Sequence, residues 1–169
     1  MNIFVTDPNP AIAARHQDLK RVVKMILESF QLMSNAMWAH GQTGFYKLSH
    51  ANHPCSTWTA QSRANFMWLL EHALELSAIY TEVYGRSHKC LRHLASCEAY
   101  AVSATFPSED PTPFANCTEY KYVADVHKAY RFQMLRKWNN DKKNPRWPAG
   151  FNYTALIDQW SKERETSPV

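Results

Sequence analysis

The stretch from Tyr46 to Trp58 reads Tyr-Lys-Leu-Ser-His-Ala-Asn-His-Pro-Cys-Ser-Thr-Trp and joins two long helical patterns. We expect these two helices to pack against each other as antiparallel neighbours, so the stretch decides how the chain folds back on itself. Loops between helices are ordinarily rich in Gly, Ser and Asp. This one instead carries an aromatic ring, a lysine, two histidines, a cysteine and a tryptophan. Because such groups titrate, stack or donate hydrogen bonds, the stretch also indicates a site.

The pattern before this stretch predicts a helix from about Pro10 to Trp38, with Asn9 as its N-cap. Because the pattern is long, we expect a bend near residues 15–18. The residues at three- and four-residue steps that predict one buried face are Leu19, Val22, Val23, Ile26, Phe30, Met33 and Met37. The short apolar run from Ile3 to Val5 predicts either a single strand or an extended N-terminal arm.

The pattern after the stretch predicts a second long helix, capped by Ser56 or Thr57 and ended by Gly85. Its buried stripe consists of Phe66, Leu69, Ala73, Leu76, Tyr80 and Val83. Three shorter helices are expected over residues 88–105, 125–138 and 154–164, separated by irregular segments. The sequence therefore predicts a mostly α-helical protein: one compact domain over residues 1–169, with about five helices, long irregular loops and a short extended N-terminal arm.

Composition narrows the class of protein. Of the 169 residues, 45% are hydrophobic and 20% are charged, which is typical of a globular chain and not of a disordered one. No apolar run approaches the ~20 residues that a membrane span needs, so we expect no membrane association. The first residues lack the charged and apolar regions of a secretory signal. The four cysteines form no Cys-x-x-Cys pair, and we interpret them as reduced thiols in the cytoplasm.

Two groups of residues could bind a metal. His50, His53 and Cys55 lie close together in sequence, and imidazole and thiolate both suit zinc. The second group is Cys90, His93 and Cys97, on one face of a predicted helix. A zinc site needs three or four protein ligands, and no further cluster has matching spacing. We therefore expect hydrogen-bonded histidines and buried thiols, with neither a metal nor another cofactor.

Cys55 could also be a nucleophile with His53 or His50 as its base. Residues on either side of a proline rarely face each other well, and no glycine loop of the oxyanion type follows. This alternative is therefore disfavoured.

The segment from Glu119 to Gly150 is strongly basic. It contains eight Lys or Arg residues against three acidic ones, a larger excess than the +4 of the whole chain. Aromatic residues alternate with these cations, and cations that meet phosphates beside rings that stack on bases suit nucleic-acid binding. The alternative is a solvated basic face whose aromatic residues belong to the core. The candidate DNA-binding residues are Lys142, Lys143, Arg146 and Trp147.

The order of these features resembles the pyrimidine-dimer DNA glycosylases of the phage endonuclease V type. That family has a short N-terminal arm, a long helix with a catalytic Glu, a loop with Tyr-Lys and Asn-His-Pro-like motifs, and a second long helix that ends in a glycine and a basic turn. The corresponding stretches here are Asn2–Val5, Asp18–Lys24, Tyr46–Lys47, Asn52–Pro54 and Tyr84–Lys89. The resemblance covers about residues 1–90, and the remaining residues match only as a basic aromatic segment.

The resemblance implies a mechanism and its residues. In that family the terminal α-amine attacks C1′ of the damaged nucleotide to form an imine, and the Glu assists ring opening and β-elimination. Here it implies Met1 as the nucleophile, Asp18 as the acid–base group, and damaged or modified duplex DNA, or a nucleotide, as the partner. The substrate-binding residues would be Arg21, Lys24, Glu28, Tyr46, Lys47, His50, His53 and Trp58. For the run that contains Asp18, Lys24 and Glu28, a solvated helix face with ion pairs is the alternative.

Three positions depart from the family pattern. Asn2 is too bulky for efficient removal of the initiator methionine, so the amine belongs to Met1. Asp18 is one methylene shorter than Glu, and Gln17 stands where Arg is expected. Two other functions therefore remain open: an enzyme on the same scaffold that acts on a modified base or nucleotide, and a non-catalytic helical protein that binds nucleic acid or another partner.

Overall fold

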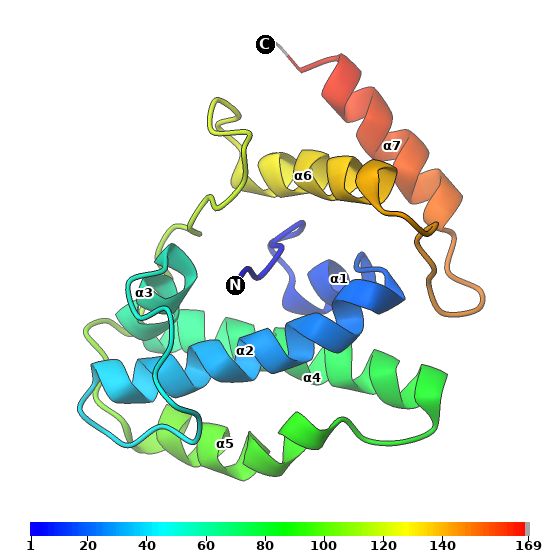
Figure 1. Ribbon diagram of the computed structural model, residues 1–169. Coiled ribbons are helices and arrows are strands. Elements are labelled where there is room, and N and C mark those ends of the chain that lie inside the picture. Colours follow the sequence, from blue (N-terminus) through cyan, green and yellow to red (C-terminus); the bar gives the residue numbers. More distant parts are fainter. Residues whose placement is uncertain (168–169) are drawn as a thin grey trace.

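The computed structural model describes residues 1–167 and is mostly helical, which confirms the predicted fold class (Figure 1). The described residues form seven α-helices and one 3-10 helix, with no β-strand. They are α1 (Pro10–Arg15), α2 (Leu19–Ala39), α3 (Pro54–Gln61), α4 (Arg63–Tyr84), η1 (Lys89–His93), α5 (Leu94–Ser103), α6 (Val126–Asn140) and α7 (Tyr153–Glu165).

The structure has more helices than the five predicted because both long helices are broken. Ser62 is extended (φ −151°, ψ 158°), and its side chain accepts a hydrogen bond from Asn65 N as the N-cap of α4. Asp18 is also extended (ψ 158°), and Leu19 N donates to Arg146 O at 2.7 Å. The expected bend near residues 15–18 is therefore a complete break, held by a contact with a distant segment.

The predicted helix caps are partly correct. Asn9 caps α1 and Gly85 ends α4 in the left-handed conformation (φ +64°), as expected. The N-cap of α3 is His53, whose ring accepts from Cys55 N, and not Ser56 or Thr57. The helix therefore begins earlier than predicted.

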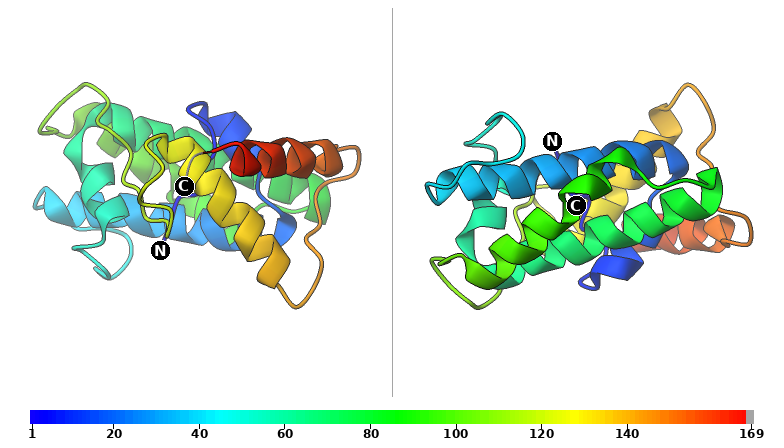
Figure 2. Two further views of the ribbon diagram at one scale, coloured as in Figure 1. Left: turned by 90° about the horizontal axis from the view of Figure 1, so that it is seen from above. Right: turned by 90° about the horizontal axis from the view of Figure 1, so that it is seen from below.

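The helices α2 and α4 lie side by side and run in opposite directions, as two views of the ribbon show (Figures 1 and 2). Most members of the two predicted stripes are buried. The fully buried members are Val22, Ile26, Phe30, Met33, Phe66, Leu69, Ala73 and Leu76. Val23 was placed on the buried face but is exposed, because it falls on the outer edge of that stripe. The antiparallel pairing itself is confirmed.

Leu69→Ala is expected to lower the free energy of unfolding by about 2–5 kcal/mol, because Leu69 is fully buried and truncation leaves a cavity. Urea denaturation of both proteins measures the difference. Met67→Ala on the exposed side of α4 is the control and should change stability by less than about 1 kcal/mol. Equal effects of the two substitutions would contradict the assignment of the buried face.

The helices α6 and α7 form a second layer, and the N-terminal arm passes between it and the α2–α4 pair (Figure 1). This layer is joined by stacked indole rings: Trp138 and Trp160 lie 5.6 Å apart with an angle of 8° between their planes. Trp160 is almost completely buried. In the described chain, no helix is both apolar enough and long enough to cross a membrane.

A buried histidine of α4 links that helix to α1 and, through Gln17, to the N-terminal arm. His72 Nδ1 donates to Pro10 O at 3.0 Å, and its Nε2 accepts from Gln17 Nε2 at 3.0 Å. Gln17 Nε2 also donates to Ile3 O. Burial lowers the pKa of His72 from 6.5 to about 4, so its ring stays neutral in the folded protein.

Stability is expected to fall as the pH drops from about 6.5 to about 4. Over that range the unfolded chain binds a proton at His72 that the folded protein excludes, which costs about 3 kcal/mol in total. His16, whose pKa burial also lowers to about 4, adds to the loss. Urea titrations at several pH values measure it. His72→Gln should give a shallower dependence, and an unchanged dependence would contradict the assignment.

Candidate functional site

The N-terminal arm is buried in the middle of the molecule. The side chains of Ile3 to Thr6 are between 0% and 5% exposed. Polar groups from α6 hold the arm: His127 Nδ1 donates to Val5 O at 3.0 Å, and Arg131 Nε donates to Thr6 O at 2.9 Å. The arm is therefore a fixed part of the core, and the position of Met1 is set by the fold.

The first four residues adopt a tight, strained turn. The Asn2 side chain accepts hydrogen bonds from the backbone N–H groups of Ile3 (2.8 Å) and Phe4 (3.2 Å). Phe4 has a φ of +58°, which is rare for a bulky residue and costs on the order of 1–3 kcal/mol. Asn2 N donates to Glu28 Oε2 at 2.9 Å. The turn and the hydrogen bond to Glu28 together place the chain terminus beside α2.

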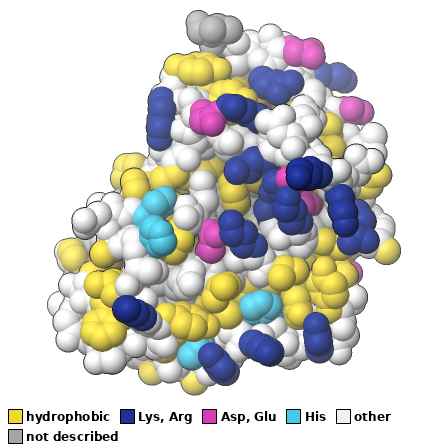
Figure 3. Space-filling model, in the orientation of Figure 1, with side chains coloured by type: hydrophobic (Ala, Val, Ile, Leu, Met, Phe, Trp, Pro, Cys, Tyr) yellow, Lys and Arg dark blue, Asp and Glu magenta, His cyan; other side chains and the backbone are white. Residues whose placement is uncertain are grey.

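Met1 lines a cleft of about 560 Å³, which we call the terminal cleft. It is lined by Met1, Asn2, Phe4, Lys20, Arg21, Lys24, Met25, Glu28, Glu119, Gln133, Arg136, Lys137, Asn140 and Asp141. Five of these side chains are cationic and three are carboxylates. Figure 3 shows Lys and Arg side chains gathered on the face where α2 begins and α6 ends. The charge of the cleft suits a ligand with more than one negative charge.

Ion pairs fix several of these side chains. Arg21 lies between two carboxylates, with its Nη1 3.0 Å from Asp18 Oδ1 and 2.6 Å from Asp141 Oδ2. Lys20 also pairs with Asp141, at 2.7 Å. Because α2 and the end of α6 are joined by these pairs, the floor of the terminal cleft is preorganised.

Lys137 carries a positive charge that its surroundings disfavour. Partial burial, and then the neighbouring cations Arg21 and Lys24, lower its pKa. Its ammonium also lies 5.6 Å from the centre of the Phe4 ring. A bound anion would relieve the repulsion among these cations, so Lys137 is well placed to contact one.

Glu28 is the carboxylate next to the chain terminus. It is 9% exposed, accepts from Asn2 N, and pairs with Lys24 at 3.3 Å. It was predicted only as a substrate-binding residue. The structure brings Glu28 together with Met1, Arg21 and Lys24, which are the other predicted residues of the terminal cleft.

Asp18, the predicted catalytic carboxylate, does not line the terminal cleft. Its side chain is 1% exposed, accepts from Trp138 Nε1 at 2.9 Å and pairs with Arg21. The break between α1 and α2 turns this carboxylate into the core beneath α6. Its observed contacts orient Arg21 and anchor α6.

The predicted loop residues lie apart from the terminal cleft. Lys47 and His50 are exposed in the connection between α2 and α3, and neither lines that cleft. The Tyr46 hydroxyl contacts Cys90 Sγ at 3.4 Å. Trp58 is 3% exposed, stacks on Phe114 and donates to Thr112 O. Its indole is therefore part of the core and is not available to stack on a substrate.

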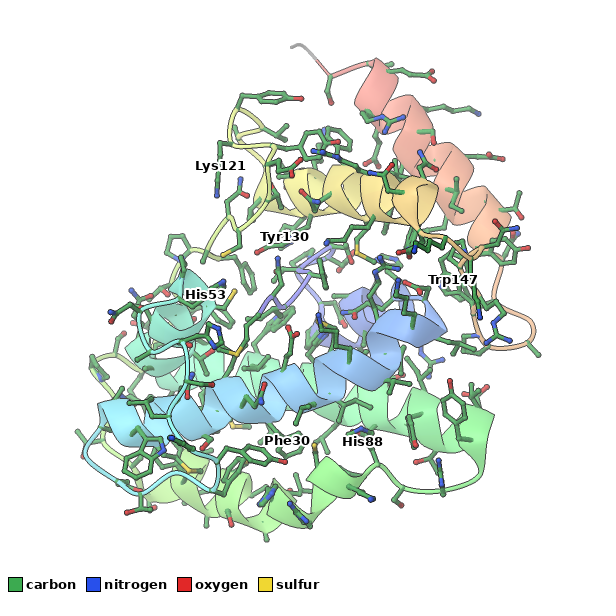
Figure 4. The ribbon with its side chains drawn as sticks, viewed as in Figure 1. Phe30, His53, His88, Lys121, Tyr130 and Trp147 are labelled. Carbon is green, nitrogen blue, oxygen red and sulfur yellow. The ribbon has the colours of Figure 1, made fainter. Side chains whose placement is uncertain are left out.

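His53 occupies an intermediate position at the start of α3 (Figure 4). Its pKa is lowered by partial burial, by the positive charge of the chain terminus and by His50. The terminal charge acts on this ring, so His53 lies within the electrostatic field of Met1 although it does not line the terminal cleft.

The predicted DNA-binding lysines lie beside the terminal cleft. Lys142, Lys143 and Arg146 are exposed and line a second depression of about 680 Å³, which we call the basic groove. The basic groove shares Lys20, Asn140 and Asp141 with the terminal cleft, so the two are continuous.

Trp147, the remaining predicted DNA-binding residue, does not line the basic groove. It is 8% exposed, stacks on Tyr153 with ring centres 4.8 Å apart, and donates to His16 O. Figure 4 places it between the end of α6 and α7. Its indole joins the second layer to the break between α1 and α2.

Several residues of the terminal cleft were not predicted as site residues. Lys20, Arg136, Lys137 and Asp141 line it together with the predicted ones. The positive charge of the segment from 119 to 150 indicated that Arg136 and Lys137 could belong to a basic site. Their position opposite Glu28 depends on the packing of α6 over the arm, which no local pattern indicates.

Comparison with known proteins gives no relative: no family model, no curated protein and no solved structure matches this chain.

Proposed function

We propose that this chain is a DNA-processing enzyme of the glycosylase/AP-lyase type, with the Met1 amine as nucleophile and Glu28 as the assisting carboxylate. The observation that supports this most is the meeting of Met1, Glu28 and five cationic side chains in one preorganised cleft. The sequence resemblance suggests the reaction, and the position of Glu28 beside the chain terminus favours it over Asp18 for the carboxylate role.

The chemistry suits these groups. A terminal α-amine is less basic than a lysine side chain, so a larger fraction of it is neutral and nucleophilic at neutral pH. It would attack C1′ of a damaged nucleotide, form an imine and release the base. Glu28 would then move protons during ring opening and β-elimination. Lys24, Arg21 and Lys137 would hold the phosphates on either side of the sugar.

A second function is favoured by the dimensions of the site. The terminal cleft, at about 560 Å³, has the size of a site for a small molecule. The same cations would then hold the phosphates of a free nucleotide, and the enzyme would act on its base or sugar. A protein that binds nucleic acid without catalysis would need no terminal amine beside a carboxylate.

Cleavage assays distinguish these functions. The protein is incubated with duplexes that contain an abasic site, a uracil or a pyrimidine dimer, and with the undamaged duplex. The proposal predicts cleavage of at least one damaged duplex and none of the control. A chain that cuts no duplex but converts a nucleotide would support the second function instead.

The salt dependence of DNA binding tests the basic groove. Replacing Lys142, Lys143 and Arg146 with Ala should reduce the slope of log K against log salt by roughly three at most. Each phosphate contact that is lost means that fewer counterions are released when the variant binds DNA. Replacing Lys89, Lys162 and Arg164, which lie outside both depressions, should leave the slope unchanged. A triple variant of the groove with the parental slope would remove this surface from the interface.

A further inference from the structure

Three side chains with soft metal-ligating atoms meet beside α3. One ring nitrogen of His53 and the Sγ atoms of Cys55 and Cys117 all lie within 4.8 Å of one another. Cys55 is 1% exposed, whereas His53 and Cys117 are partly accessible to solvent. No other group of this kind is found among the described residues. The residues Cys90, His93 and Cys97, which are spaced like ligands in the sequence, do not form one.

The distance between the two sulfur atoms fits a shared metal ion. Cys55 Sγ and Cys117 Sγ are 3.7 Å apart. Two thiolates bound tetrahedrally to one zinc ion at about 2.3 Å each lie about 3.8 Å apart. A disulfide would require about 2.05 Å between the same atoms. The sulfur atoms therefore stand at the separation that zinc needs, without further movement.

The fold holds both cysteines in place. Cys55 belongs to the first turn of α3, where Pro54 begins the helix and His53 caps it. Cys117 is fixed from the other side by Tyr130 of α6, a fully buried residue whose hydroxyl accepts from Cys117 N at 3.2 Å and donates to Ala115 O at 2.8 Å. In Figure 4, His53 and Tyr130 lie on different elements, α3 and α6, beside the N-terminal arm.

We propose that His53, Cys55 and Cys117 form a binding site for one Zn²⁺ ion. Two thiolates and an imidazole are a soft donor set of the kind that zinc accepts, and three protein ligands leave the fourth tetrahedral position for water. Binding displaces one proton from each thiol into solvent. It also ends the hydrogen bond from Cys55 N to His53 Nδ1, because the ring has only two nitrogen atoms and must keep a proton on the one that is not bound to the metal.

The sequence did not predict this metal site because its ligands are not all close together along the chain. His53 and Cys55 are adjacent ligands, but the third ligand comes from a loop 62 residues further along the chain. Only the packing of that loop against α3 and α6 completes the set. The inference does not depend on the proposed DNA chemistry, since the metal can be measured without any DNA.

The chain supplies a matched control for this site. His88 and Cys90 repeat the local geometry of His53 and Cys55: the His88 ring caps a helical turn and accepts from Cys90 N at 3.2 Å, the same distance as in the proposed site. Cys90 is also buried. No second cysteine joins this pair in a ligand group within the described residues. If metal binding requires Cys117, it should therefore occur at the His53–Cys55 motif and not at the His88–Cys90 motif.

Cobalt substitution tests the proposal. The reduced, chelator-treated full chain is titrated with Co²⁺, and the absorption of tetrahedral thiolate-bound cobalt is recorded. The result expected is one Co²⁺ per chain, displaced by Zn²⁺, in the parent and in Cys90→Ser. Cys117→Ser and His53→Gln should weaken binding by more than the roughly 10–100-fold that loss of an outer-shell partner costs. Circular dichroism establishes that each variant is folded.

Two results would overturn the proposal. One is a parent protein that binds Co²⁺ and Zn²⁺ no more tightly than Cys117→Ser. The other is equal loss of binding in Cys90→Ser and Cys117→Ser. Because Cys117 lies in a loop and is only partly buried, its replacement keeps the test independent of folding.

Discussion

Glu28→Gln is expected to lower the cleavage of damaged duplex DNA by about 10²–10⁴-fold, while binding of the same duplex stays close to that of the parent. General acid–base assistance is typically of this size, and the amide can no longer exchange a proton. Gln can still accept the hydrogen bond from Asn2 N, so the arm should remain in place. Single-turnover cleavage and binding titrations on one duplex measure the two quantities.

Asp18→Asn is the matched control, and here we expect the opposite of what the sequence predicts. The sequence predicts the large catalytic loss for Asp18 and the small one for Glu28. Because Asp18 is buried beneath Trp138 and bonded to Arg21, its replacement should mainly lower stability. A Glu28→Gln protein with parental cleavage, or an Asp18→Asn protein that is stable but inactive, would return the carboxylate role to Asp18.

Adding two residues, Gly-Ser, before Met1 is expected to reduce imine formation to background. The terminal amine would move out of the terminal cleft, while the buried segment from Ile3 to Thr6 and the bond between Asn2 and Glu28 could remain. Secondary structure and salt-dependent binding should therefore change little. The measurement compares covalent trapping of the extended and parental chains on the same duplex.

The extended chain also distinguishes a reaction that uses the terminal amine from one that does not. Loss of trapping with retained DNA binding is the expected pattern for an amine nucleophile. A fully active extended chain, with its added residues still present by mass, would exclude the terminal amine from the reaction.

The helices were predictable because their buried faces repeat along the sequence. The stripes through Ile26 and Leu69 identified α2 and α4, Asn9 marked the start of α1, and Gly85 marked the end of α4. The breaks at Asp18 and Ser62 were not predictable. Each is stabilised by contacts with a remote segment: Arg146 O for the residue after Asp18, and Ser108 O for the residue after Ser62.

Apart from Met1, which the family resemblance implied, the candidate site was predictable only where its residues share one helix. Arg21, Lys24 and Glu28 lie at three- and four-residue steps on α2, and all three reach the terminal cleft. Asp18 lies near the same helix face in sequence, yet the indole of Trp138, 120 residues away, draws it into the core. Trp58 and Trp147 could have been either stacking or core residues, and only their burial distinguishes these roles.

Borohydride trapping tests whether the Met1 amine is the nucleophile, because it captures the covalent bond between the chain and DNA. The parent is incubated with duplexes carrying an abasic site, a uracil or a dimer, reduced, and digested for mass mapping. We expect a protein–DNA adduct whose modified peptide begins at Met1 and carries the sugar on its α-amine. An adduct on a lysine side chain, or no adduct with any of these duplexes, would contradict it.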